Sequence, residues 1–385
     1  MHLSKKGAFF FDMMINDLIK YYENRVPKGM SWEKDNVGLQ IGSLNKPFKN
    51  ILVCLELTSD SLQFAINNNC NLIFTHHPFL FTPLKNINTD KDSGKIISLA
   101  IKNDITVYSS HTNLDFVKGG VSFELAKRLK LQNLKFLSNF EKNQYKISVF
   151  VPESYVEIVS KGIFEAGGGI IGDYENCSYR VKGEGTFKGN ENTNPTIGTK
   201  QILEKVDEIK LEIIVNRWDL NKVIYSLKQT HPYEEPAYDI IPLENKNENH
   251  GAGVIGTLLQ PINLNSFFEL IKSELNLDGF RYTVGKDKPI ERVAVCGGSG
   301  SDLLNEAILQ KADAFITADI KYHTFHDAKG KITLIDAGHY ETEIFGLNTI
   351  KNIIYNYFDE YSINTEVFEY FDTNPIKFYY NIGEK

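Results

Sequence analysis

The stretch Asn71-Leu72-Ile73-Phe74-Thr75-His76-His77-Pro78 joins a short apolar run to two adjacent histidines and a proline. The apolar run predicts a buried β-strand, which Pro78 ends because proline has no N–H to contribute to a ladder of hydrogen bonds. In open α/β sheets, ligands bind outside the carboxyl ends of the strands. His76 and His77 are therefore candidates for chemistry, although two histidines alone are more often structural than metal-binding.

Strands and helices alternate around this stretch, a pattern that is typical of a parallel sheet covered on both faces. The strand over 105–110 leads directly into His111-Thr112-Asn113-Leu114-Asp115, so further polar groups follow a strand end. The polar, glycine-punctuated segment 31–42 predicts a loop. Helices are expected over 13–24, 59–69, 94–103 and 119–129, and strands over 51–55, 72–75 and 105–110.

The pattern changes near residue 137. The following elements are expected in the order strand, helix, strand, strand, helix, strand, which is the order of the ferredoxin-like class. A bridge rich in Lys, Asn and Glu, residues 244–250, then leads back to an α/β pattern. We therefore predict one α/β domain made of residues 1–137 and 251–385, interrupted by an α+β insert of residues 138–250.

The two ends of the chain resemble each other. Residues 51–77 align without a gap on residues 293–319, and the third strand, 105–107, has a counterpart at 332–334. The gapless length favours duplication over chance similarity, so the expected fold class is α/β, with two duplicated halves forming one domain. His76-His77 falls on Ala318-Asp319 in this alignment, so the halves differ where chemistry is expected. The matched pairs include Val53 with Val295, Cys54 with Cys296, Asp60 with Asp302 and Thr75 with Thr317.

Composition narrows the class of protein. The chain has 385 residues, enough for two to three domains, and its net charge of −7 gives no global attraction to nucleic acid or anionic membranes, although a local basic patch remains open. No run of eighteen apolar residues predicts a membrane span. Residues 1–12 lack the features of a cleaved signal peptide, so we expect a cytoplasmic protein. The four cysteines form no Cys-x-x-Cys pair, so any metal must be held by imidazole and carboxylate.

A second group of ligand-type residues lies in the last part of the chain. His339 and Glu343 are four residues apart at the start of an expected helix, so both lie on one face, whereas Glu341 points away. The candidate ligands are His76, His77, Asp115, His339 and Glu343. Five such residues suit two metal ions better than one, since a single tetrahedral ion takes about four ligands. Mixed imidazole and carboxylate ligation favours zinc or iron and allows manganese.

Several short motifs, in the order in which they occur along the chain, resemble those of a family with a dinuclear metal centre. This family is the GTP cyclohydrolase 1 type 2 homologues, also called Nif3-like. The resemblance runs from about residue 32 to residue 345, and 194–198 with 231–239 resemble the insert of the longer members. Glu56 stands where the family usually has Asp, and residues 1–12 lie outside the pattern. The motifs are Asp35-Asn36-Val37-Gly38-Leu39, Thr75-His76-His77-Pro78, His111-Thr112-Asn113-Leu114-Asp115, Val295-Cys296-Gly297-Gly298-Ser299-Gly300, Asp319-Ile320-Lys321-Tyr322-His323 and Asp336-Ala337-Gly338-His339-Tyr340-Glu341-Thr342-Glu343.

The resemblance implies a specific site, assembly and reaction. It implies two divalent metal ions held by the five candidate ligands, an insert similar to the PII and CutA regulators, and a ring-shaped homohexamer. The implied reaction is hydrolytic opening of the guanine imidazole ring of GTP with release of formate.

Three further features are open to two interpretations. His111 and His323 are tentative catalytic residues, and a structural role for His323 is about as plausible as that of a general acid. Gly297-Gly298-Ser299-Gly300 could hold a phosphate through backbone N–H groups, or could simply form a tight turn between strand and helix.

Two functions are therefore weighed. The first is a metal-dependent hydrolase, in which a metal-bound hydroxide attacks a nucleotide-like substrate. The second is a metal-stabilised ring without catalysis, whose insert binds a small ligand or a partner.

Overall fold

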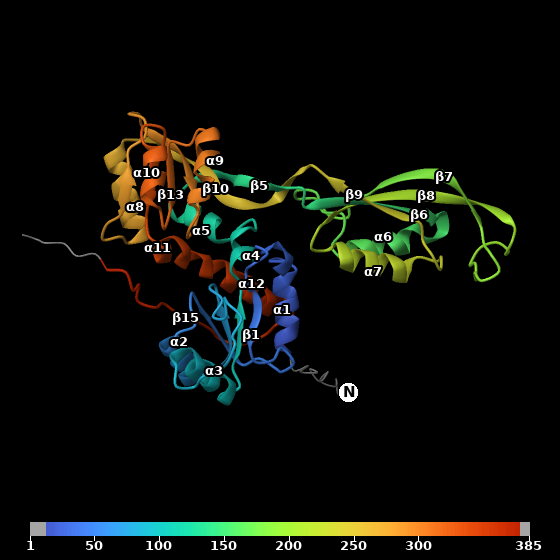
Figure 1. The fold of residues 1–385 in the computed structure, drawn as a ribbon, viewed down its shortest axis with the longest axis horizontal. Helices are drawn as coiled ribbons and strands as arrows, with labels where there is room; N and C mark the ends of the chain where they lie inside the picture. Colours follow the sequence, from blue (N-terminus) through green and yellow to red (C-terminus); the bar gives the residue numbers. More distant parts are fainter. Residues whose placement is uncertain (1–12, 378–385) are drawn as a thin grey trace, which may run out of the picture. The chain divides into compact units, whose positions relative to one another are not determined.

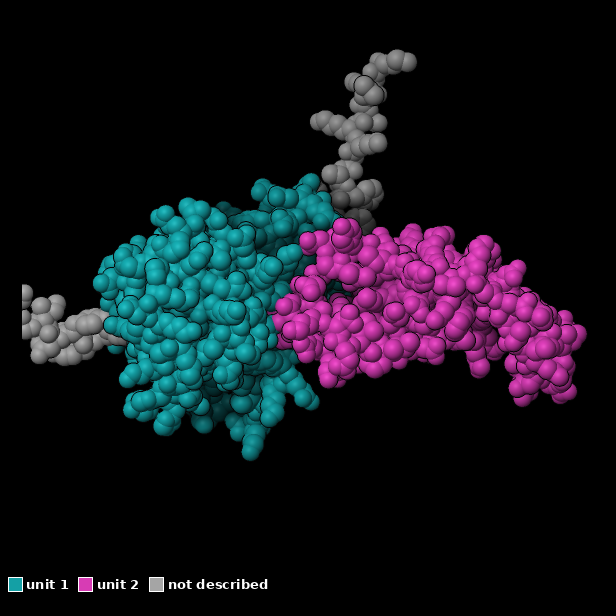
Figure 2. Space-filling view, turned by 90° about the horizontal axis from the view of Figure 1, so that it is seen from above, with its two compact units in different colours: residues 1–138, 252–385 teal, residues 139–251 magenta. Residues whose placement is uncertain are grey.

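The structure is a computed structural model that describes residues 13–377. The chain forms two compact units, residues 1–138 with 252–385 and residues 139–251 (Figure 2). The chain leaves the first unit within strand β5 (Gln132–Glu141) and re-enters it within β10 (Lys246–Ile262). Residues 1–12, interpreted above as lacking a signal peptide, lie outside the described part.

The first sheet of unit 1 is built from the predicted strands β2 (Asn50–Cys54), β3 (Cys70–Thr75) and β4 (Thr106–Ser109), which are parallel. The colours of residues 50–109 in Figure 1, blue to teal, show where this part of the chain lies. Strand β1 (Gly38–Ile41) pairs antiparallel with β4. The prediction of a loop over 31–42 was therefore wrong for residues 38–41, because an edge strand of only four residues is too short to show a clear alternation of polar and apolar side chains. The sheet order is β1-β4-β3-β2-β15, with β15 spanning Val367–Tyr370.

Helices cover both faces of this sheet. Residues of α2 (Ser59–Asn67) and α3 (Asp92–Lys102) share one buried cluster with Ile73. Phe74 points to the other face, because side chains alternate along a strand, and its ring lies 5.3 Å from that of Tyr22 in α1 (Ile15–Glu23). Helix α12 (Leu347–Tyr361) contacts α1 and β2. The strand that carries His76 and His77 is thus held on both sides.

The second sheet repeats the arrangement of the first. Strands β12 (Ile290–Val295), β13 (Ala314–Thr317) and β14 (Thr333–Asp336) are parallel, and β11 (Arg281–Thr283) pairs antiparallel with β14 as β1 does with β4. On its other edge, the order continues from β12 to β10 and β5. The α/β class is therefore confirmed.

Helices also surround the second sheet. Helix α5 (Val121–Arg128) comes from the first half of the chain, yet Phe123 shares a buried cluster with Phe267 of α8 (Leu264–Leu275) and with the second sheet. Leu304 and Ala307 of α9 (Leu304–Leu309) and Ala328 of α10 (Tyr322–Ala328) lie in a further cluster on this sheet. Helix α5 therefore links the two halves of unit 1.

Unit 2 is an antiparallel four-stranded sheet in the order β7-β8-β6-β9, with two helices. Its elements follow one another as β6 (Gln144–Pro152), α6 (Val156–Glu165), β7 (Tyr179–Lys188), β8 (Leu203–Asn216), α7 (Leu220–Thr230) and β9 (Tyr238–Leu243).

The two helices of unit 2 pack on one face of the sheet, where Val149, Val159, Leu211 and Val223 are buried together. The segment 244–250, predicted as a bridge that leads out of the insert, includes the first residues of β10, which begins at Lys246. Exposed and buried residues alternate from Lys246 to Glu248, which allows a polar segment to form a strand. None of the described helices is both long and apolar enough to cross a membrane.

Candidate metal centre

The five candidate ligands come from three strand ends. His76 and His77 directly follow β3, and Asp115 closes the short helix α4 (Thr112–Asp115) just after β4. His339 and Glu343 begin and end α11 (His339–Glu343), which follows β14. The carboxyl ends of strands from both sheets thus supply the group.

Glu343 lies at the centre of the cluster. Its Oε2 atom is 2.9 Å from Nε2 of His77 and 3.0 Å from Nε2 of His339. Its Oε1 atom is 3.8 Å from Nε2 of His76, which in turn is 3.8 Å from Oδ1 of Asp115. One carboxylate therefore faces imidazoles on two sides.

Each imidazole of the cluster is oriented by an oxygen at its Nδ1 atom. The Nδ1 atom of His76 contacts the carbonyl oxygen of Ser110 at 2.8 Å. The partners of His77, His339 and His111 are carboxylates, namely Glu56 at 3.3 Å, Asp319 at 2.6 Å and Asp35 at 2.9 Å. Such partners fix the tautomer that leaves Nε2 free to bind a metal.

Three buried atoms test whether this site suits a metal. Nε2 of His76 and Oδ1 of Asp115 are buried without a hydrogen bond to any residue that the structure describes, and Oε2 of Glu343 also forms none, although the Nε2 atoms of His77 and His339 lie close to it. A buried polar atom without a partner costs about 1–3 kcal/mol. All three are ligand types for divalent transition metals. The donor set therefore fits such an ion, which would give each atom a partner.

The pKa values of the cluster are displaced in opposite directions. Burial raises the pKa of Asp115 well above its ordinary value, and the charge of Glu343 adds to this. Burial would also raise the pKa of Glu343, but its contacts with His339, His76 and His77 hold it well below. A divalent cation would favour the ionised form of both carboxylates.

The pKa values of the histidines are also displaced in opposite directions. Burial lowers the pKa of His76. Burial acts in that direction on His77 too, but contacts with Glu343 and Glu56 raise its pKa to about 10. The contact with Glu343 raises the pKa of His339 to about 9.

The glycine turn after β12 supports Glu343. A Cβ atom on Gly298, which has a φ of +61°, would lie 2.0 Å from Oε1 of Glu343. The N–H groups of Gly297, Gly298 and Gly300 donate to the hydroxyls of Ser122, Thr342 and Thr317. Because these donors are used inside the protein, the turn is explained by close packing, and the interpretation as a phosphate cradle loses its support.

The two tentative catalytic histidines lie in different surroundings. The ring of His111 lies 5.3 Å from His76 and 5.4 Å from His77, and the three residues could together hold an ion. His323 is exposed on α10 beside Tyr322. Among the described residues, no hydrogen bond or ion pair joins His323 to the cluster, so its catalytic role stays a prediction.

Two carboxylates were not assigned a role from the sequence. Asp35 accepts hydrogen bonds from the N–H and the hydroxyl of Thr112 as well as contacting His111. Asp319 contacts His339 from the strand end equivalent to that of His77. Asp35 and Asp319 each begin one of the motifs quoted in the sequence analysis, and this position is the signal that could have pointed to them.

Known proteins are similar over most of the chain. A protein of Halalkalibacterium halodurans described as "GTP cyclohydrolase 1 type 2 homolog" is 40% identical over 84% of this chain and 87% of its own length. One of Bacillus subtilis with the same description is 36% identical over 94% of this chain and 97% of its own. The solved structure of a Bacillus cereus protein "related to NIF3" has a TM-score of 0.80 and 37% identity, covering 95% of this chain and 99% of that one. The family model of Duf34/NIF3 (NGG1p interacting factor 3) matches residues 13–375, and the chain therefore belongs to this family.

Proposed function

We propose that the protein is a metal-dependent hydrolase that acts on a nucleotide-like substrate. The observation that carries this proposal is the buried carboxylate of Glu343, which has imidazoles on both sides. We assign His76, His77, Asp115, His339 and Glu343 as ligands of two divalent ions, zinc or iron by preference and manganese as a further possibility.

The protein contributes position and charge to this site. When bound, the metal ions supply Lewis acidity and an activated water molecule at neutral pH. Glu56, Asp319 and the carbonyl of Ser110 hold three imidazoles in the orientation that binding needs. His111 is placed to bind an ion or to accept a proton at Nε2, while Asp35 holds its Nδ1. His323 is retained as a candidate general acid.

The nucleotide-like substrate is supported by the relatives. Two proteins at 36–40% identity carry the description "GTP cyclohydrolase 1 type 2 homolog". We extend this description to the present chain as a hypothesis, with GTP as the first substrate to test and formate as the expected product. Phosphate esters come next, since a dinuclear site also suits their hydrolysis.

Metal content is the first experiment. The protein is purified without added metal, and the metal per chain is measured by mass spectrometry for the wild type, Glu343→Gln and Glu341→Gln. Glu341 is the matched control, because it lies on the same helix but its Oε1 atom accepts from Asn374. About two equivalents in the wild type and in the control, with at most half of that in Glu343→Gln, support the site. No metal in the wild type, even after incubation with zinc, iron or manganese, overturns it.

Turnover is tested separately with the metal that is found. Formate release from GTP and phosphate release from phosphate esters are compared between the wild type and Asp115→Asn. An enzyme loses turnover in this variant while its assembly is unchanged. A metal-loaded protein that releases neither product from these substrates contradicts the proposed hydrolase.

A second candidate function is a metal-stabilised ring without catalysis, whose insert binds a small ligand or partner. Unit 2 favours it, because it has a hydrophobic core of its own and a separate pocket. We propose that this insert is PII/CutA-like and that the chain forms a homohexamer. Sedimentation would show a six-fold mass, and a monomer would contradict the assembly.

A further inference from the structure

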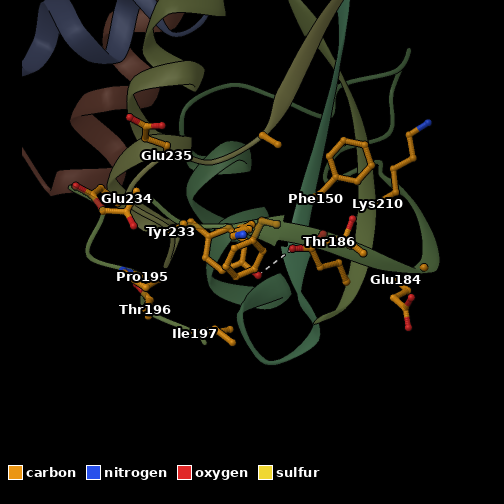
Figure 3. Close-up of a pocket in the computed structure, with 18 of the residues that line it drawn as sticks. Phe150, Glu184, Thr186, Pro195, Thr196, Ile197, Lys210, Tyr233, Glu234 and Glu235 are labelled. Carbon is orange, nitrogen blue, oxygen red and sulfur yellow. Dashed lines mark hydrogen bonds between the residues drawn. The ribbon is translucent and has the colours of Figure 1, made fainter. Parts of the chain in front are cut away.

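Unit 2 contains a pocket of about 770 Å³. The pocket lies against strands β7 and β8 and is also lined by residues of two loop segments, 189–197 and 233–237 (Figure 3). Its volume falls within the range of about 300–1,000 Å³ that is typical of small-molecule sites. All of its residues belong to unit 2, so the pocket does not depend on the metal centre.

The pocket lies on the face of the sheet that the helices leave open. Val149 and Leu211 point into the core under α6 and α7. Their neighbours Phe150 and Lys210 point the other way, because side chains alternate along a strand, and both line the pocket (Figure 3). Gly185 adds room, since a Cβ atom there would lie 2.1 Å from Oε2 of Glu208.

Glu208 places a carboxylate in this pocket. Its residue is only 9% exposed, and its Oε1 atom accepts a hydrogen bond from the hydroxyl of Tyr233 at 2.9 Å. Among residues 13–377, no Lys, Arg or His nitrogen forms an ion pair with it. Burying a carboxylate without a cation is costly. A cationic ligand would provide the missing partner.

Tyr233 is held in place by its neighbours. The N–H of Tyr233 donates to Nδ1 of His231 at 3.1 Å, and Nε2 of His231 donates to the carbonyl oxygen of Phe150 at 3.0 Å. The loop that carries Tyr233 is therefore fixed to β6. The pocket is preformed, which reduces the entropy that a ligand must overcome.

The other charges around the pocket leave an excess of carboxylates. Three of the charged residues that line the pocket have a local partner of opposite charge: Lys182 pairs with Glu153, Lys210 with Glu212, and Glu184 with Lys205. The remaining charged groups of the lining are Glu208, Glu234, Glu235 and Lys188. Glu234 accepts only a neutral donor among the described residues, the N–H of Asn194. The local field therefore favours a positively charged ligand.

Aromatic rings complete the recognition of a cation. Phe150, Phe187 and Tyr233 line the pocket, and the rings of Phe187 and Tyr233 lie 5.7 Å apart. Ring faces attract cations, by about 0.5–1 kcal/mol at exposed sites and more where water is excluded. We propose that this pocket binds a small organic cation, an amine, amidine or guanidine, with its N–H groups on Glu208 and its body against the rings.

The test uses three probes of nearly the same shape and different charge on the full-length protein. Benzamidine is a cation at neutral pH, benzamide is neutral and benzoate is an anion. Binding is measured by saturation-transfer NMR, with spermidine as a longer cation. We expect saturable binding of benzamidine, and binding weaker by about tenfold or more for benzamide and benzoate. Equal binding of the three probes, or no binding of either cation, overturns the proposal.

Two variants locate the site. Glu208→Gln keeps the shape and removes the charge, so benzamidine should bind about tenfold or more weakly. The control is Glu157→Gln on α6. It also removes one negative charge, but Glu157 does not line the pocket and pairs with Arg180. Phe187→Leu keeps all charges and should weaken benzamidine about two- to fivefold, while leaving benzamide unchanged. Thermal unfolding checks that each variant is folded, and unchanged binding in both pocket variants places the probe elsewhere and overturns the proposal.

Discussion

The Nε2 atom of His77 lies 2.9 Å from Oε2 of Glu343, although the two residues follow strands of different sheets. The cluster therefore exists only because the carboxyl ends of both sheets meet. Helix α5, which packs its Phe123 in the core of the second sheet, helps to fix this arrangement. Residues that orient the imidazoles from outside the cluster should thus affect metal binding.

Asp319→Asn should weaken metal binding. The carboxylate of Asp319 contacts Nδ1 of His339 at 2.6 Å and so orients its Nε2 toward Glu343. Loss of such a partner typically costs about 10–100-fold in metal affinity. Asn is the suitable replacement, because residue 319 has a φ of +54° and Asn tolerates this left-handed region. The affinity is measured by competition with a chelator of known strength.

Asp327→Asn is the control for this change. Asp327 is exposed on α10, and the same charge is removed without touching the cluster. It should bind metal as the wild type does. If Asp319→Asn and Asp327→Asn have the same affinity, the proposed role of Asp319 in orienting His339 is wrong.

Gly298→Ala should displace Glu343. The new Cβ would lie 2.0 Å from Oε1 of Glu343, so the carboxylate must move from its place between the imidazoles. Gly330→Ala is the matched control, because Gly330 has a φ of +73° but no atom within 4 Å of the new Cβ. Both variants should lose about 1–2 kcal/mol of stability from backbone strain, measured by urea unfolding of metal-free protein. Only Gly298→Ala should also lose metal, and equal metal content in both would contradict this account.

Much of this architecture could be predicted from residue patterns. The alignment of 51–77 with 293–319 anticipated two sheets with the same parallel core. His339 and Glu343 could be placed together because helical spacing is regular. The contact between Nε2 of His339 and Oε2 of Glu343 follows from that spacing. Adjacent strand ends explained why His76 and Asp115 meet.

Features that depend on tertiary contacts were missed. The strand β1 has only four residues, and its outward side chain Leu39 is exposed, so no periodicity marks it. Strand β15 joins the sheet of the first half from the far end of the chain, which no local pattern indicates. The carboxylate of Asp35 reaches His111 across a loop, a contact that requires three-dimensional information.

Asp35→Asn should destabilise unit 1. One oxygen of Asp35 contacts His111, and the other accepts from the N–H of Thr112 at 3.1 Å. Burial works to raise the pKa of Asp35, but the hydrogen bonds from His111 and Thr112 lower it to about 2. An Asn side chain offers only one acceptor, so the loss of a bond to a charged group predicts a cost of about 1.5–3 kcal/mol. Urea unfolding of chelator-treated protein measures this cost without a contribution from metal.

The pH dependence of this difference gives a further check. A carboxylate with a lowered pKa in the folded state contributes stability above its unfolded value of 3.8, and this contribution is lost as the pH falls toward about 2. The variant and the wild type should therefore converge in acid. Asp90→Asn, at an exposed loop position, should match the wild type throughout. A difference that persists at low pH would show that the cost comes from packing.

His250 should make unit 2 sensitive to acid. Its ring lies 4.8 Å from that of Trp218, and burial lowers the pKa of His250 from 6.5 to about 4. Between these values the unfolded chain binds a proton that the folded unit does not. The stabilising contribution of the neutral ring is therefore complete above pH 6.5 and is lost as the pH falls toward about 4. Because the ring is partly exposed, we expect a loss of about 1–2 kcal/mol.

The measurement uses the fluorescence of Trp218 during urea unfolding. The chain has two tryptophans, and Trp32 belongs to unit 1, so Trp32→Phe provides the background. His250→Phe keeps a ring against Trp218 and removes the titrating group, so its stability should fall less than that of the background protein between pH 6.5 and 4. His326→Phe, at an exposed position on α10, should behave like the background. If His250→Phe and the background protein lose stability in parallel, other groups of unit 2 cause its acid sensitivity.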